Sequence, residues 1–66
     1  MSPEQEKELK YIVKCYRGKS WSGDEITRVV RRVARGWSRN PHRVADSVID
    51  KFLDDNGLPV DVDDVE

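Results

Sequence analysis

The sequence has little that points to catalysis, metal binding or a membrane. Its 66 residues include one cysteine, Cys15, so no disulfide can form within the chain. No apolar run approaches the roughly 20 residues that a membrane-spanning helix needs, and we find no apolar stretch like that of a secretory signal. We therefore expect a cytoplasmic protein without membrane contact, whose stability comes from helix packing and from association.

Motifs for chemistry are also missing. The chain has no Ser, His and acid arrangement and no Gly-rich phosphate loop, and Cys15 and His42 lack the spacing of metal ligands. Folding a chain of this size removes only about 60% of its surface from water, so its core is small. The chain is also too short to enclose a substrate pocket of several hundred cubic ångströms. We expect no enzyme activity, no metal, no cofactor and no small-molecule substrate.

Charge is abundant and is divided along the chain. Charged residues make up 38% of the sequence and hydrophobic residues 36%, which is typical of a small domain with a charged exterior. Residues 1–43 carry eleven Lys and Arg against five Asp and Glu, whereas residues 44–66 carry one Lys against eight acids. The two parts attract each other, although the formal net charge is only −1.

Helix signals predict the fold. Three segments combine a start signal, an apolar stripe at helical spacing and a stop signal, and they cover about residues 3–17, 23–37 and 41–56. The sequence therefore predicts an all-α fold, a compact three-helix bundle in residues 1–58. A short acidic tail at residues 59–66 lacks helical period and is expected to be flexible.

Capping residues set the predicted helix ends. Ser2 and Ser22 begin capping boxes, and Asn40 before Pro41 is the expected start of the third helix. Gly57 is predicted to end that helix in the left-handed conformation of a Schellman motif. The two tryptophans flank the second helix, and we expect them to close the two ends of the bundle.

The second predicted helix is strongly amphipathic. Its apolar face holds Ile26, Val29, Val30, Val33 and Trp37. Its opposite face holds Arg28, Arg31, Arg32 and Arg35. Like charges four residues apart cost about 0.2 to 0.5 kcal/mol per pair in an isolated helix, so we expect a negative partner to offset this cost. A solvated face supported by the acids at positions 24 and 25 is the plain alternative.

The acids of the third predicted helix also favour pairing with arginine. Asp46, Asp50 and Asp54 line the side away from its apolar face. Asp50 and Asp54 lie toward the helix C-terminus, where the helix dipole disfavours negative charge by about 0.3 to 1 kcal/mol each. Arginines of the same chain or of a partner would relieve this. Calcium is not expected, because two carboxylates one turn apart do not supply its roughly six oxygen ligands.

Two further segments leave alternatives open. Tyr11 and Cys15 lie opposite Leu9 and Val13 on the first helix, and they form either a contact for a partner or a pair covered by Trp21 or by the tail. The tail alternates Val with Asp. As an extended strand it can add to the edge of a partner's sheet or shield the arginines of its own domain, and a solvated acidic terminus is the plain alternative.

Together these features favour a small interaction module, which acts as a regulator, adaptor or inhibitor on a larger macromolecule and associates with itself. The predicted contact residues are Arg28, Arg31, Arg32, Arg35, Arg39, Arg43, Tyr11, Cys15, Asp46, Asp50 and Asp54. The partner is a protein or a second copy of the chain. Nucleic-acid phosphate is the alternative, with Arg39 and Arg43 extending the arginine row. A third helix in the major groove would present aspartates to phosphates, which disfavours a helix-turn-helix.

Overall fold

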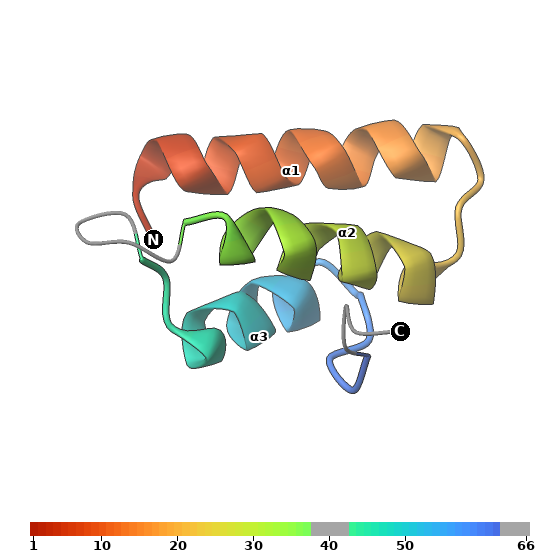
Figure 1. The fold of residues 1–66 in the computed structure, drawn as a ribbon. Helices are drawn as coiled ribbons and strands as arrows, with labels where there is room; N and C mark the ends of the chain where they lie inside the picture. The colour runs from red at the N-terminus through yellow and green to blue at the C-terminus, as the bar shows by residue number, and fades with distance from the viewer. Residues whose placement is uncertain (38–42, 63–66) are drawn as a thin grey trace.

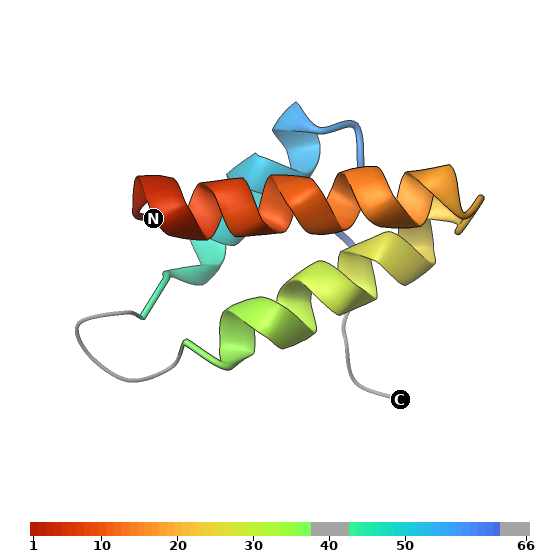
Figure 2. The same ribbon diagram turned by 90° about the horizontal axis from the view of Figure 1, so that it is seen from above.

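The computed structural model describes residues 1–37 and 43–62, which form three helices and, within these ranges, no strand. Helix α1 spans Pro3–Gly18, α2 spans Gly23–Arg35 and α3 spans Asp46–Asp55. The central helix, α2, contacts both of the others and runs antiparallel to each of them (Figure 1). Seen from above, α1 lies across α2 and α3 (Figure 2). The predicted all-α three-helix bundle is confirmed.

Both predicted capping boxes form. The Ser2 hydroxyl accepts the backbone N–H of Gln5, whose side chain accepts the backbone N–H of Ser2. The same reciprocal bonds join Ser22 and Glu25 at the start of α2. These bonds satisfy amides that the first helical turn leaves without partners, so local sequence alone fixes where α1 and α2 begin.

The third helix is shorter than predicted. It begins at Asp46, not near residue 41, because residues 43–45 are not helical and Ala45 is an extended N-cap without a side-chain capping bond. Val44 packs against the core from this extended approach. Its apolar side chain fits the helical stripe of the sequence equally well, and the prediction was therefore wrong there. Asn40 and Pro41, the expected start, lie outside the described residues.

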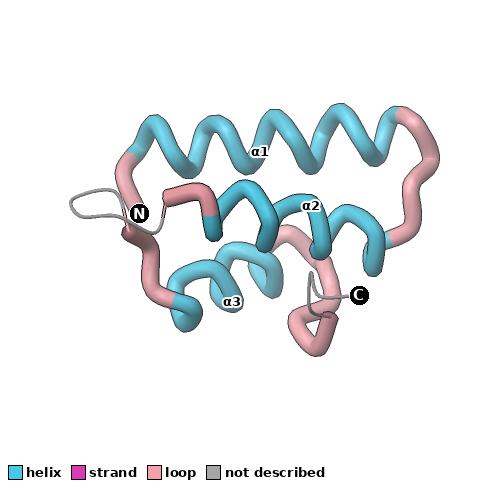
Figure 3. The backbone as a smooth tube through the Cα atoms, viewed as in Figure 1, coloured by secondary structure: helices cyan, strands magenta, loops and turns pink. Residues whose placement is uncertain are grey.

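The end of α3 follows the prediction. Gly57 has φ +71°, its N–H donates to the carbonyl of Asp54 at 3.0 Å, and the Leu58 N–H donates to the carbonyl of Leu53 at 2.8 Å. These two bonds define a Schellman motif. They turn Leu58 into the core and send the following residues back beneath α2, where Figure 3 shows them as a loop.

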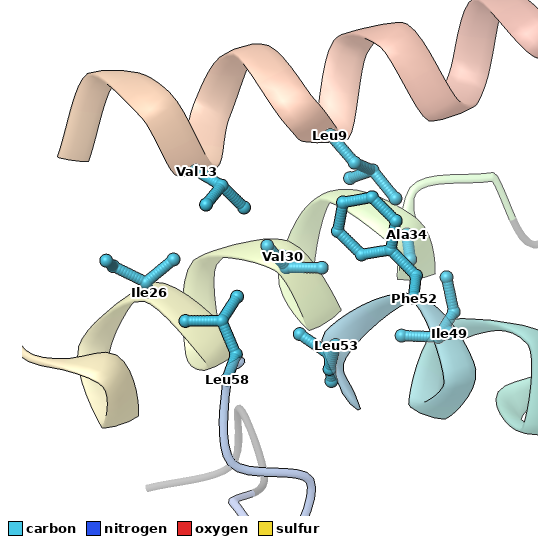
Figure 4. Close-up of a cluster of buried hydrophobic side chains, with 9 residues drawn as sticks. All are labelled: Leu9, Val13, Ile26, Val30, Ala34, Ile49, Phe52, Leu53 and Leu58. Atoms are coloured by element: carbon cyan, nitrogen blue, oxygen red, sulfur yellow. The ribbon is translucent and has the colours of Figure 1, made fainter. Parts of the chain in front are cut away.

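The core lies where the three helices meet (Figure 4). Its buried apolar side chains are Leu9, Val13, Ile26, Val30, Ala34, Ile49, Phe52, Leu53 and Leu58. Val13 lies over Ile26 and Val30, and Leu9 reaches toward Phe52 of α3. Because α2 supplies the middle of this core, its own orientation decides which of its other residues face α3 and which face solvent.

Ala in place of Gly57 tests the Schellman motif. We expect a loss of about 1 to 2 kcal/mol in the free energy of unfolding, because an L side chain is strained at this positive φ. Gly18→Ala is the matched control. A Cβ there has nothing within 4 Å, and stability should stay equal or rise. Urea unfolding followed by circular dichroism measures both variants, and equal losses would contradict this role of Gly57.

Candidate interaction surface on helix α2

Arg31 does not face solvent with the other arginines of α2. Its Nη2 donates to Oδ1 of Asp50 at 2.9 Å and to the carbonyl of Val60 at 2.6 Å, and its Nε donates to the carbonyl of Val62 at 2.6 Å. The Arg31 side chain is only 13% exposed. It therefore joins α2, α3 and the segment after α3. Arg31 therefore does not lie on the outward-facing side of α2 where the sequence predicted it.

The groove between α2 and α3 is lined by opposite charges. Arg31 and Asp50 share this groove of about 290 Å³ with Arg35 and Asp46. Arg35 lies one turn after Arg31 on α2, and Asp46 lies one turn before Asp50 on α3. Because the two helices are antiparallel, Arg35 and Asp46 lie at the same level of the groove. Attraction within the chain thus relieves part of the acidic stripe of α3, one of the two kinds of pairing expected from the sequence. Asp54, farther along the stripe, is exposed.

The C-terminus of α3 has its own cation. Arg17 of α1 donates from Nη2 to the carbonyl of Asn56, the C-cap of α3. The C-terminal end of a helix carries partial negative charge, and the carboxylates of Asp54 and Asp55 add to it. A guanidinium at this position offsets the resulting repulsion. Arg17 was not among the predicted site residues. The charge division between the two parts of the sequence was its only signal.

Arg28, Arg32 and Arg35 are exposed on α2, and we call these three residues the Arg surface. Within the described part of the chain, Arg28 and Arg32 form no hydrogen bond or ion pair. Glu25, an expected source of local support, instead bonds to the N-cap of α2. Two adjacent guanidinium groups of α2 therefore keep their full hydrogen-bonding capacity.

Arg43 continues the Arg surface past the end of α2. It is exposed, and with Arg35 and the half-buried Trp37 it lines a second groove of about 250 Å³. Arg39, the other predicted extension, lies outside the described residues. Trp37 also packs against the core, so an aromatic ring is held beside two arginines.

Tyr11 and Cys15 face outward on α1. Tyr11 is 68% exposed and Cys15 is half-buried. A hydrogen bond with the Cys15 side chain and the charge of its thiolate raise the pKa of Tyr11 above its usual value. Trp21 stacks on Tyr16 with ring centroids 4.3 Å apart, and it is 39% exposed.

Residues 59–62, predicted as part of a flexible tail, are bonded to α2. Thr27 is fully buried and donates from Oγ1 to the carbonyl of Pro59 at 2.8 Å. Gly23 allows the Pro59 ring to approach, since a Cβ there would lie 3.1 Å from its Cδ. Sequence reasoning missed Thr27, although it stands three residues before Val30 on the buried stripe. Residues 63–66 lie outside the described residues.

Comparisons with known proteins add no relative. No family model matches the chain, and no significant match exists among curated proteins or solved structures. In residues 1–37 and 43–62, no helix has the length and apolarity needed to cross a bilayer. The same ranges hold no cluster of three or more His, Cys, Asp or Glu suited to a metal ion. The exposed side chains themselves therefore have to support any functional proposal.

Arg31→Met tests the link between the helices and residues 59–62. We expect a loss of about 1 to 3 kcal/mol in the free energy of unfolding, because Asp50 and two carbonyls lose their donor. Arg31→Lys should restore only part of it, since an ammonium group cannot reproduce the guanidinium fork. Urea unfolding followed by circular dichroism gives the free energy of unfolding of both variants.

Arg28→Met is the matched control for this prediction. Arg28 is exposed on the same helix and has no bond of this kind, so the change should alter stability by less than about 0.5 kcal/mol. Equal effects of the two substitutions would show that Arg31 does not hold these segments together.

Proposed function

We propose that this chain is a non-catalytic protein-interaction module, and that its Arg surface binds a carboxylate-rich face of a larger protein partner. Arg28, Arg32 and Arg35 project from one helix whose other side is locked into the core. Arg43 extends the row. A row of this kind suits a small regulator, adaptor or inhibitor, because the helix that carries the arginines is already ordered before binding.

The observation that carries the proposal is the unpaired state of Arg28 and Arg32 within the described residues. These two like charges stand four residues apart, a spacing that destabilises an isolated helix by about 0.2 to 0.5 kcal/mol. No anion of the described residues lies within ion-pair distance of either guanidinium, whereas Arg31 has three acceptors. Guanidinium groups pair with carboxylates through two parallel hydrogen bonds, so an acidic partner would restore the balance.

A protein partner fits this surface better than a nucleic acid does. Carboxylates border the Arg surface, with Asp24 one turn before Arg28 and Asp46 in the adjoining groove. A nucleic-acid backbone presents phosphates at regular short intervals, and some would meet these acids. The net charge of −1 also gives no general attraction to a polyanion. A protein surface can place its carboxylates opposite the arginines and leave the acids free.

Charge reversal on the Arg surface tests the proposal. The variant Arg28→Glu/Arg35→Glu is compared with Lys7→Glu/Lys14→Glu, which makes the same change of charge at exposed positions of α1. Each protein is used as bait in nuclease-treated extract, and bound proteins are quantified by mass spectrometry. We expect a partner retained by the wild type and the Lys variant, and reduced at least about tenfold by the Arg variant.

Circular dichroism must first show that both variants keep the helical content of the wild type. Equal recovery by the Arg and Lys variants would exclude the Arg surface as the binding site. Binding to a duplex of about 20 base pairs that falls steeply with salt, and that only the Arg variant loses, would replace the proposal with a nucleic-acid function.

A further inference from the structure

One face of the α1–α2 hairpin is left uncovered by α3. On α1, Lys10 lines the groove toward α3, and Arg17 bonds to the end of α3. At 3.6 residues per turn, Tyr11 and Cys15 lie about 100° to 160° around the helix from these two residues. Tyr11 and Cys15 therefore point away from α3, and Tyr11 is 68% exposed there.

Val29 points the same way from α2. It stands two residues before Arg31, which faces α3 and the chain after it, so it lies about 160° around α2 from that contact. Val29 is only half-buried, and it is not among the side chains that pack against the core. The uncovered face thus carries apolar groups on both helices of the hairpin.

One charged residue extends the apolar patch of each helix, at the intervals of three and four residues that are typical of packed helices. Glu8, Tyr11 and Cys15 follow one another at intervals of three and four residues on α1, and Val29 precedes Arg32 by three on α2. We call these five residues the hairpin face. Neither Glu8 nor Arg32 has an ion pair or hydrogen bond within the described part of the chain.

We infer that a second copy of this chain docks on the hairpin face, α1 against α2 and α2 against α1, to form a four-helix bundle. Val13 lies over Ile26 and Val30 in one copy (Figure 4), which fixes the antiparallel register of the hairpin. In that register Glu8 is level with Arg32, and Tyr11 with Val29, to within about one residue or 1.5 Å.

A two-fold axis that runs along the hairpin, between the directions of α1 and α2, keeps this level while exchanging the two helices. It therefore sets Glu8 of each copy opposite Arg32 of the other, and Tyr11 opposite Val29. Every contact occurs twice. A partner of uniform charge would be repelled by either Glu8 or Arg32, whereas a second copy complements both. Arg32 belongs to both surfaces, whereas Arg28 and Arg35 remain outside this contact, so the inference goes beyond the proposed function and is tested separately by the oligomeric state.

Sedimentation equilibrium of the full chain provides the first test. We expect a dimer with twice the monomer mass of 7.7 kDa at concentrations of about 10 to 500 µM. Tyr11→Asp and Val29→Asp should each raise the dissociation constant at least about tenfold, because each places a charge among apolar groups. Ser47→Asp, at an exposed position of α3, is the control and should leave the constant unchanged.

A mixing experiment identifies the contact itself. Glu8→Arg alone and Arg32→Glu alone should each weaken the dimer at least about tenfold, because like charges then face each other twice. Equal amounts of the two variants should form a mixed dimer near wild-type strength, since both contacts again join opposite charges. Native mass spectrometry with one isotope-labelled variant separates mixed dimers from homodimers.

Rescue by mixing cannot come from a bond inside one copy, so it distinguishes contact between copies from contact within the hairpin. A wild-type chain that stays monomeric up to about 1 mM would overturn the inference. A dimer that survives Tyr11→Asp and Val29→Asp, or variants that fail to restore each other, would place any association on a different face. Circular dichroism confirms beforehand that each variant is folded.

Discussion

The guanidinium group of Arg31 ties the central helix to two other parts of the chain at once. It bonds to Asp50 of α3 and to the carbonyls of Val60 and Val62, so α2, α3 and the segment after α3 share one polar junction. The apolar side of α2 forms the middle of the core. Together these contacts fix the rotation of α2, and that rotation determines which of its arginines stay outside.

Local sequence predicted the features that depend on near neighbours. The capping boxes of Ser2 and Ser22 and the turn at Gly57 involve residues three to five positions apart, and all three are confirmed. The acceptors of Arg31 lie 19 to 31 positions away. Helical periodicity showed that Arg31 lies off the apolar stripe, but it could not show that α3 and residues 59–62 flank that side.

The same limit explains the start of α3 and the behaviour of the chain end. Ala45 supplies no capping side chain, so nothing in its own residue type indicates a helix start. Thr27 and Gly23 hold Pro59 through one hydrogen bond and one close approach, both set by tertiary packing. Helical periodicity did predict which side of each helix is apolar and which side is polar. It therefore placed Tyr11, Arg28 and Arg32 away from the main apolar stripes, and all three are exposed.

The division of the arginines into one internal and three outward residues can be measured directly by NMR of the arginine Nε–H groups. We predict that the Arg31 Nε–H exchanges with water at least about tenfold more slowly than those of Arg28 and Arg32, because Arg31 donates from Nε to a carbonyl and these two have no such bond among the described residues. A hydrogen-bond coupling from Arg31 Nε to the Val62 carbonyl should accompany it. Equal exchange rates for all four arginines of α2 would contradict the division.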